Sequence, residues 1–269
     1  MMKNAKVLVC LVIPLLLGAC IKTQIRNKPP ARRTLAQLIS KQEPAWPLVQ
    51  GWIKQAKNKV EVLPATHPQN ETALLNTQVT TSSPMGAIVY ETGGILVDDG
   101  WLRRLGSGSE RLQRNLPDFN KSTGTDIASG DIPFLLVADD AIGGFFALDG
   151  GKLGDPGKVF YLEPDSLRWI NLELSYSEFL NSMFQSDLDE FYKGLRWKGW
   201  RSEVKQLGGE QGLSFYPFLF TQGPALEKRS RKAVPILELY KLEQDFIEKF
   251  HPQKLPPKTR TPLKSDLTS

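Results

Sequence analysis

Groups that could act as nucleophiles, acids or bases are few in this chain, and their settings do not favour catalysis. The sequence of 269 residues contains two histidines. His67 lies between Thr66 and Pro68, and His251 follows the last apolar run, so neither lies in a motif typical of general acid–base chemistry. No serine has the Gly-x-Ser-x-Gly context of an activated nucleophile. We therefore expect no catalytic histidine or serine.

Phosphate and metal motifs are incomplete as well. The run from Gly106 to Ser109 lacks the third glycine of a dinucleotide loop and the Gly-Lys-Ser/Thr of a phosphate loop, so we interpret it as a flexible turn. The pairs Asp98-Asp99 and Asp139-Asp140 could contact a hard cation, but they lack the register of a calcium loop. We interpret both pairs, and Asp149 before two glycines, as turn residues. The sequence predicts neither a cofactor nor a metal site.

Carboxylates alone could still support one reaction class. Hydrolysis of a glycosidic bond needs two carboxylates roughly 5–9.5 Å apart. Glu91, beside Gly93-Gly94, or Asp149 would be among its groups. A carboxylate-dependent hydrolase of cell-wall glycans is therefore the alternative to a non-catalytic function.

The strands that would position these acidic residues cluster in the middle of the chain. Short β-branched and aromatic runs, separated by Asp and Gly turns, predict strands there. The predicted strands are 60–63, 87–90, 94–97, 134–138, 144–148 and 158–162, with apolar residues Trp101, Leu102 and Leu105 after the turn at 98–100. Strands between terminal helices predict an α+β fold with a central antiparallel or mixed sheet and flanking helices.

Helical periodicity appears on both sides of these strands. It predicts helices that start after Thr34 and near Trp46, and others over 71–77, 175–183, 188–195 and 235–250. The polar segment 118–131 is predicted to be an exposed excursion. Six aromatic residues between Trp197 and Phe220 are expected to lie mostly in the core, with a partial surface patch as the alternative.

The N-terminus indicates where the protein resides. Lys3 and Lys6 precede an apolar run that ends in Leu17-Gly18-Ala19-Cys20, which resembles the lipobox of bacterial secretion signals. The resemblance implies cleavage before Cys20, lipidation of Cys20 and attachment to a membrane by acyl chains. Because Cys10 would leave with the signal, the mature domain would contain no thiol for a disulfide, a zinc-thiolate site or redox chemistry.

This interpretation divides the chain into four parts. They are a lipoprotein signal peptide (1–19), an anchor spacer (20–33), a single α+β domain (34–251) and a disordered tail rich in Pro and Lys (252–269). Ile21, which follows the cysteine where an aspartate would retain an enteric lipoprotein, favours the outer membrane, facing the periplasm.

Charge is unevenly distributed along the chain. The formal net charge is +5, but the basic excess lies near the two ends, and the segment from Thr34 to His251 has a charge of about −5. A basic patch for nucleic acid is therefore not expected in the folded domain, whose acidity suits a basic protein partner.

Seven stretches of this sequence resemble the bacterial domain of unknown function 2625, and they span nearly all of 34–250. The stretches are Pro44–Val49, Val60–Pro64, Gln78–Thr81, Tyr90–Gly94, Gly100–Arg103, Gly143–Leu148 and Gly212–Pro217. More distantly, Phe134–Leu180 is similar to the core of the SUKH superfamily. The SUKH likeness implies an α+β fold and, by analogy with many members, binding to a protein partner.

These observations predict a non-catalytic module that binds another macromolecule at the cell envelope. Its membrane contact would be the lipidated Cys20, and its protein partner, which the sequence does not name, would be basic. We expect the partner to meet a rim of aspartate turns at one edge of the sheet, formed by Asp98, Asp99, Asp139, Asp140 and Asp149.

Overall fold

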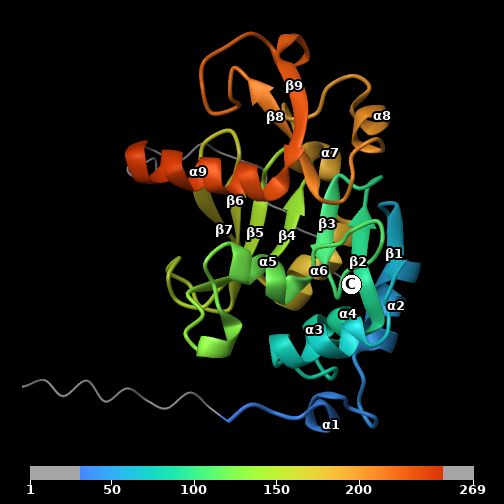
Figure 1. The fold of residues 1–269 in the computed structure, drawn as a ribbon. Coiled ribbons are helices and arrows are strands. Elements are labelled where there is room, and N and C mark those ends of the chain that lie inside the picture. Colours follow the sequence, from blue (N-terminus) through green and yellow to red (C-terminus); the bar gives the residue numbers. More distant parts are fainter. Residues whose placement is uncertain (1–30, 251–269) are drawn as a thin grey trace, which may run out of the picture. The chain divides into compact units, whose positions relative to one another are not determined.

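The computed structural model describes residues 31–250, and this part of the chain forms an α+β fold on one antiparallel sheet (Figure 1). The predicted signal peptide, Cys20, most of the spacer, His251 and the tail lie outside the described residues. The strands are β1 (Val60–Pro64), β2 (Thr92–Val97), β3 (Leu102–Leu105), β4 (Phe134–Asp140), β5 (Phe145–Asp149), β6 (Lys158–Glu163) and β7 (Arg168–Ser175). Their order in the sheet is their order in the chain, and each neighbouring pair is antiparallel.

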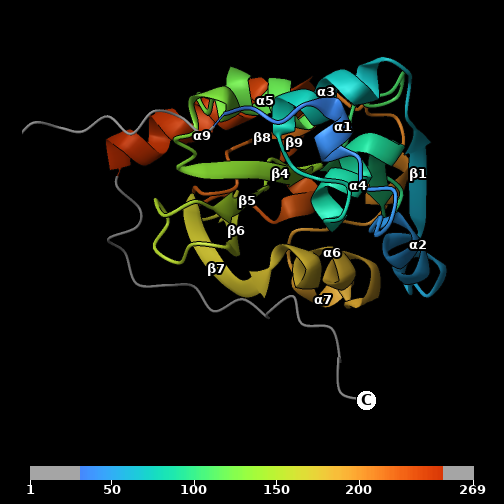
Figure 2. The same ribbon diagram turned by 90° about the horizontal axis from the view of Figure 1, so that it is seen from below.

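Helices flank the sheet, so the predicted α+β class is confirmed. Figure 2 shows α5 and α9 on one face of the sheet, and α6 and α7 on the other. The helices are α1 (Leu35–Leu38), α2 (Trp46–Lys54), α3 (Gln69–Thr77), α4 (Pro84–Glu91), α5 (Leu116–Ser122), α6 (Tyr176–Gln185), α7 (Leu188–Phe191), α8 (Trp200–Val204) and α9 (Ile236–Phe250), with short 3-10 turns η1 (Ile127–Ser129) and η2 (Leu226–Lys228). Among residues 31–250, no helix has both the length and the apolar character needed to span a bilayer.

The middle strands are buried on both faces. All residues of β2 and β4 are buried, and Leu136 and Val137 on β4 have no exposed surface. Helices on both sides of the sheet explain this burial and also the continuous apolar runs, which lack the alternation of a strand with one wet face.

One predicted strand is a helix. The run Ala87–Tyr90 was predicted as a strand from its β-branched and aromatic residues, but it lies in α4. Ser83 caps this helix by accepting a hydrogen bond from the backbone N–H of Gly86 at 3.2 Å, and Pro84 occupies the first turn. Gly86 also lies so close to the carbonyl of Thr80 that a Cβ atom would overlap it. Capping and close packing therefore override the strand propensity of this run.

The predicted exposed excursion 118–131 is partly wrong. It contains most of α5 and all of η1, and Asn120 within it has no exposed surface. The Asn120 side chain donates to the carbonyls of Leu116 and Leu136 at 2.9 and 2.8 Å, and accepts from the N–H of Leu136 at 2.8 Å. The Asn120 amide therefore links α5 to β4. Hydrophobic periodicity in the sequence does not reveal such a contact.

Three strands were not predicted. β7 forms one edge of the sheet, and a separate antiparallel hairpin is made by β8 (Gln211–Tyr216) and β9 (Ser230–Pro235). The hairpin leads directly into α9. The predicted helix start at Ser175 is confirmed: its hydroxyl accepts from the N–H of Glu178, and the Glu178 carboxylate accepts from the N–H of Ser175 at 2.7 Å.

Candidate functional site

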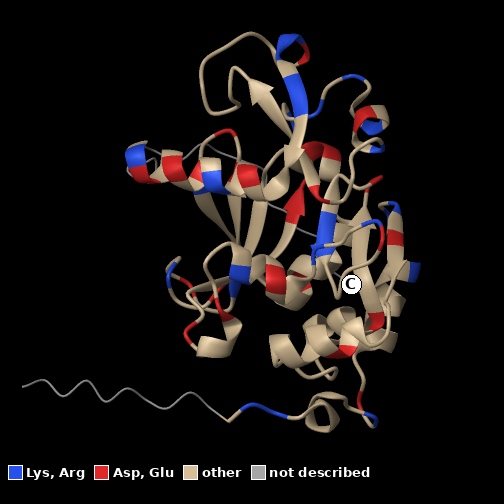
Figure 3. Ribbon diagram, viewed as in Figure 1, with Lys and Arg blue, Asp and Glu red and all other residues tan. Residues whose placement is uncertain are grey.

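A charged groove runs between the β1–β3 side of the sheet and the segment that carries α8. It consists of two adjoining pockets of about 470 and 700 Å³ that share Lys59 and Asp99. Most of its side chains are charged, and both signs are present, as Figure 3 also indicates for these elements. The charged residues that line the groove are Lys57, Lys59, Glu61, Asp98, Asp99, Arg103, Glu110, Arg111, Asp187, Asp189, Glu190, Arg196, Arg201, Lys205 and Glu210.

Asp99 is the point at which the two pockets meet. It follows β2 in a turn whose residues Asp98, Asp99 and Gly100 have φ values of 53°, 59° and 88°, as expected for an Asp-Asp-Gly turn. Its carboxylate accepts a hydrogen bond from Lys59 Nζ at 2.6 Å, which lowers the pKa of Asp99 against the opposing effect of burial. The side chain of Asp99 is only 10% exposed.

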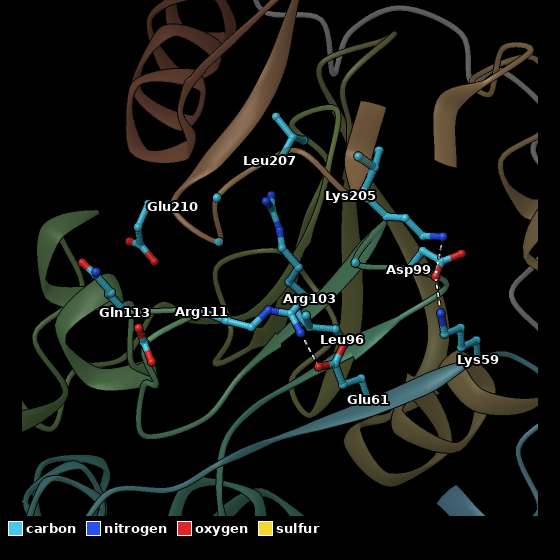
Figure 4. A pocket seen from close by; sticks show the side chains of 15 residues that line it. Lys59, Glu61, Leu96, Asp99, Arg103, Arg111, Gln113, Lys205, Leu207 and Glu210 are labelled. Atoms are coloured by element: carbon cyan, nitrogen blue, oxygen red, sulfur yellow. Dashed lines mark hydrogen bonds and ion pairs between the residues drawn. The ribbon is translucent and has the colours of Figure 1, made fainter. Parts of the chain in front are cut away.

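Three exposed cations converge on this one carboxylate. Besides Lys59, the Nζ of Lys205 lies 3.6 Å from Asp99 Oδ1, and Arg201 Nε lies 3.7 Å from Oδ2. The side chains of Lys59, Lys205 and Arg201 are 66%, 58% and 50% exposed. Figure 4 shows Lys59 and Lys205 approaching Asp99 from different elements. Together the three cations carry more N–H donors than the roughly four lone-pair sites of the Asp99 carboxylate can accept, so the cluster retains capacity to bind acceptors on another molecule.

Asp98 forms an ion pair with a buried guanidinium group. Its carboxylate lies 2.7 Å from Arg196 Nη2 and 3.1 Å from Arg201 Nη2. Arg196 is 8% exposed, and its guanidinium lies over the rings of Trp101 and Trp200 at 4.7 and 4.2 Å. Arg196, which lines the groove, is therefore backed by the edge-to-face rings of Trp101 and Trp200.

The floor of the groove is a buried ion cluster. Arg103 donates to Asp139 at 2.6 Å and to the carbonyls of Asp140 and Gln211, and Arg114 pairs with the same Asp139 carboxylate. Asp139 has no exposed surface. The expectation that Asp139-Asp140 form a turn at a binding rim is wrong: both residues belong to β4, and Arg103 lies opposite Asp139 in the neighbouring strand.

Asp140 lies beneath the β4–β5 turn and is also fully buried. It accepts from the N–H groups of Ile142 and Gly144 at 3.0 and 2.8 Å and from the Tyr161 hydroxyl at 2.7 Å. Burial raises the pKa of Asp140 in spite of these bonds. Glu243 on α9 is likewise buried, and both its own burial and the nearby Asp140 raise its pKa well above the usual range.

Asp149 lies at the opposite end of the sheet from Asp139. The β4–β5 register pairs Phe134 with Asp149 and Asp139 with Phe145. The Asp149 carboxylate accepts from the N–H groups of Gly151, Leu153 and Asp155 at 2.8 to 2.9 Å, and it is 3% exposed. The single aspartate rim expected from the sequence therefore does not exist: Asp98 and Asp99 line the groove, whereas the other three aspartates organise the interior and a loop.

The aromatic run divides between the core and the surface. Trp197, Trp200 and Phe215 are buried, as expected for most of the run. Tyr216 is 73% exposed, and Phe218 and Phe220 form a stacked pair with centroids 5.2 Å apart. Trp197, Trp200 and Phe215 therefore match the expected core position, whereas Tyr216 matches the alternative of a partial surface patch.

The remaining candidates occupy structural or exposed positions. The His67 side chain is 71% exposed and lies 3.7 Å from the Glu71 carboxylate. Ser107 is fully buried and donates to the carbonyl of Thr92 at 2.8 Å, so the Gly106–Ser109 run is a packed turn and not a flexible one. In the described part of the chain, no group of three or more His, Cys, Asp or Glu side chains could hold a metal ion.

Glu91 and Asp149 do not form a catalytic pair. Glu91 ends α4 immediately before β2, and Asp149 ends β5. Three strand spacings of ~4.8 Å separate β2 from β5, so the two residues are roughly 14 Å apart across the sheet. This separation exceeds the range of a glycosidase pair.

The groove was missed by sequence reasoning because its parts come from distant segments. Lys59 precedes β1, Asp99 follows β2, and Arg201 and Lys205 belong to α8 and its C-terminal end. The Asp98-Asp99-Gly100 turn was the one local signal, and it located a single wall.

The family model "Protein of unknown function DUF2625" matches residues 35–239. The putative uncharacterized protein YbfG of Escherichia coli (strain K12) is 43% identical over 219 residues, which are 81% of this chain and 99% of YbfG. An uncharacterized protein of Haemophilus influenzae (strain ATCC 51907 / DSM 11121 / KW20 / Rd) is 46% identical over 220 residues, 81% of this chain and 95% of that protein.

No solved structure matches the chain, so the likeness to the SUKH superfamily is not confirmed. The family match covers most of the described fold and includes the strands and helices that form the groove. The chain is a member of the DUF2625 family.

Proposed function

We propose that this chain is a lipid-anchored protein of the cell envelope and acts as a non-catalytic module that binds another protein through the charged groove. One observation carries the proposal: three exposed cations surround Asp99 where two pockets of about 470 and 700 Å³ adjoin. Buried charges in folded proteins are usually paired. Here the paired groups line an open groove large enough for a segment of a partner.

The mixture of positive and negative side chains that line the groove supports a protein partner and not a nucleic acid. Acidic residues such as Asp189 and Glu210 stand beside Lys59, Arg201 and Lys205, so a uniformly anionic backbone would meet repulsion along much of its length. A protein surface with both signs can pair with both kinds of group, which favours specificity and faster association. The partner we expect carries acidic side chains toward the three cations and basic ones toward Asp189 and Glu210.

The catalytic alternative gains no support from the arrangement of carboxylates. Glu91 and Asp149 are separated by three strands. The cavity that reaches Glu243 has a volume of about 20 Å³, which is too small for a sugar ring. We therefore propose binding without catalysis.

The lipid anchor rests on the sequence Leu17-Gly18-Ala19-Cys20, and the preference for the outer membrane rests on Ile21. Cells that express the full chain can be labelled with a clickable fatty-acid analogue. We expect label in the wild-type protein and none in Cys20→Ala. Label in both proteins would contradict the anchor, and label in neither would contradict lipidation of this chain altogether.

The groove is tested by photo-crosslinking in living cells, with the crosslinker placed at Lys205 in the full chain. Lys152, which is exposed on the loop after β5, serves as the matched control position. We expect the same protein to be captured from Lys205 in repeated experiments, and not from Lys152. Lys205→Glu, combined with a crosslinker at Lys59, should reduce that capture at least threefold. Equal capture from Lys205 and Lys152 would overturn the groove as the binding surface.

A further inference from the structure

A carboxyl group is buried where α9 packs against the large sheet. Glu243, in the middle of α9, is 6% exposed, and its Oε2 atom has no hydrogen-bond partner among residues 31–250. The carboxyl lies against the β4–β5 turn, since a Cβ atom built on Gly143 would be 2.8 Å from Glu243 Oε1. Figure 1 shows α9 lying across this end of the strands. A carboxylate here would lack the donors that an interior charge requires, so the protonated form of Glu243 is favoured.

A second buried carboxyl group acts on Glu243 from β4. Asp140 has no exposed surface, and its carboxylate accepts hydrogen bonds from two backbone N–H groups and from the Tyr161 hydroxyl. Asp140 therefore has donors that stabilise a negative charge, whereas Glu243 Oε2 has none in the described chain. Burial, followed by the charge of Asp140, raises the pKa of Glu243 well above its usual range. Ionisation of Glu243 would add a second like charge to the same interior site.

Neighbouring groups on α9 itself do not offset a charge on Glu243. The residues one helical turn away on either side are Leu239, Tyr240, Phe246 and Ile247, and none of them is a cation. Burial, followed by the charge of Glu243, raises the pKa of Tyr240 to about 12, so this phenol stays neutral up to pH 9.

The elements packed against this part of α9 supply no compensating cation within residues 31–250 either. β8 and the loop that follows it carry no charged side chain over 211–225. On β3, Arg103 is paired with the carboxylate of Asp139. The β6–β7 side contributes a further acid, Glu163 at the end of β6. Burial and Asp140 therefore act on Glu243 without an opposing positive charge.

Only the first turn of α9 is tied by its main chain to a neighbouring segment of the described fold. The N–H of Ile236 donates to the carbonyl of Glu210 at 2.9 Å, and α9 is the last element of the described chain. Later turns are held by buried side chains such as Leu239 and Tyr240, whose ring centroid lies 5.0 Å from that of Phe145 on β5. Because α9 supplies no strand to either sheet, outward movement about its first turn would leave the strand pairing intact.

We propose that α9 is a pH-sensitive latch, closed while Glu243 carries its proton and open once that proton has passed to solvent. In the closed state the neutral carboxyl is tolerated in the interior, and the apolar contacts of α9 hold the helix on the sheet. In the open state the ionised carboxylate is hydrated, which removes the cost of burying it beside Asp140. The equilibrium therefore shifts toward the open state as the pH rises. The latch does not depend on the proposed binding function, because neither Glu243 nor Asp140 lines the charged groove.

Distances between paired spin labels test the latch, because the chain from residue 21 onward contains no cysteine and includes the compact unit that begins at Ala31. Labels are attached at Glu248→Cys on α9 and Lys54→Cys on α2, both exposed positions. At pH 5 we expect the single distance of the closed state. At pH 9 we expect a second, displaced population, at least fivefold larger than at pH 5. With Glu243→Gln, which keeps the size of the side chain but cannot ionise, this population should stay at its pH 5 level.

Glu238→Gln, which changes an exposed acid on the same helix, is the matched control and should respond to pH like the labelled parent chain. Labels at Lys121→Cys on α5 and Lys54→Cys report on the rest of the fold, and their distance should not change with pH. Glu243→Met is a second neutral variant and should also remain closed at pH 9.

A parent chain with the same α9 distance at pH 5 and pH 9 would overturn the proposal, as would an equal pH response of Glu243→Gln and Glu243→Met. So would a simultaneous change in the distance between Lys121→Cys and Lys54→Cys, which would indicate general unfolding and not movement of α9. None of these results bears on the groove, which the crosslinking experiment tests separately.

Discussion

Arg103 Nε lies 2.6 Å from Asp139 Oδ1, and the side chains of the two residues are only 3% and 0% exposed. They occupy opposite positions of the β3–β4 ladder. Arg114 pairs with the second carboxylate oxygen, so that one buried anion forms ion pairs with two guanidinium groups. This cluster fixes the floor of the groove, and its energetics can be measured.

Asp139→Ala should lower the free energy of unfolding by about 3–5 kcal/mol, because it leaves two buried guanidinium groups without their anion. Urea unfolding followed by circular dichroism measures the change. Lys193→Gln is the control, since Lys193 belongs to a pair with Glu190 whose side chains are 76% and 43% exposed. That change should alter stability by no more than about 0.5 kcal/mol. Similar losses in the two variants would contradict a special role for the buried cluster.

Glu243 should make the fold less stable as the pH rises. Burial and the nearby Asp140 raise its pKa well above the usual glutamate value of 4.5. A carboxyl group with a higher pKa in the folded state binds more protons when folded, so stability falls from about pH 4.5 upward through the raised pKa. Glu243→Gln should remove this fall, and it should exceed the wild-type protein in stability at pH 8 but not at pH 4.

Unfolding midpoints in urea at pH 4, 6 and 8 provide the test. Glu238→Gln, at an exposed position of the same helix, is the control and should follow the wild-type curve. A pH dependence that Glu243→Gln leaves unchanged would show that this carboxyl is not the cause.

Asp149→Ala should loosen the loop between β5 and β6. Burial disfavours the ionised carboxylate, but the bonds from Leu153, Gly151 and Asp155 prevail and lower the pKa of Asp149. Its contribution is therefore present above the usual Asp pKa and is lost as the pH falls below about 4. We expect a loss of about 1–3 kcal/mol and faster hydrogen exchange at Leu153 and Asp155. Asp131→Ala, at an exposed position, should leave these amides unchanged.

Two glycines in helices should respond to alanine with opposite signs. A Cβ on Gly86 of α4 would overlap the carbonyl of Thr80, whereas a Cβ on Gly51 of α2 has no neighbour within 4 Å. Gly86→Ala should therefore destabilise the fold by about 1–3 kcal/mol, because close-packed backbone must move. Gly51→Ala should stabilise it by about 0.5–1 kcal/mol through helix propensity. Thermal unfolding of both variants decides the signs.

The sequence predicted elements well where local signals were complete. The helix after Ser175 has both halves of a capping box, and the strands near 134–148 are bounded by Asp and Gly turns. It failed for α4, where four residues of strand propensity are overruled by the Ser83 cap and by the contact of Gly86 with Thr80. That contact depends on packing between segments, which single-residue propensities do not contain.

In the candidate site, too, the features with local sequence signals were predicted and those that depend on distant segments were not. Asp98 and Asp99 were placed correctly in a turn, but the cations that surround them come from the residue before β1 and from α8 and its C-terminal end, and they carry no spacing signal. Asp139 was interpreted as a turn residue because it follows an apolar run. Its ion pairs with Arg103 and Arg114, which are distant in the sequence, explain why β4 continues through this residue. Long-range charge pairing is therefore the information that the sequence alone did not supply.

In the large sheet the strands lie in the order in which they occur in the chain, and this order affects how the protein can fold during synthesis. Each strand from β2 to β7 pairs with the strand synthesised just before it. A chain that emerges N-terminus first can extend the sheet one strand at a time, without waiting for a distant partner and with modest loss of loop entropy at each step. The β8–β9 hairpin and α9 come last and close over a sheet that is already complete. Truncation from the C-terminus should therefore leave nascent chains that hold a partial sheet, whereas loss of a middle strand would leave two halves with no matching edge.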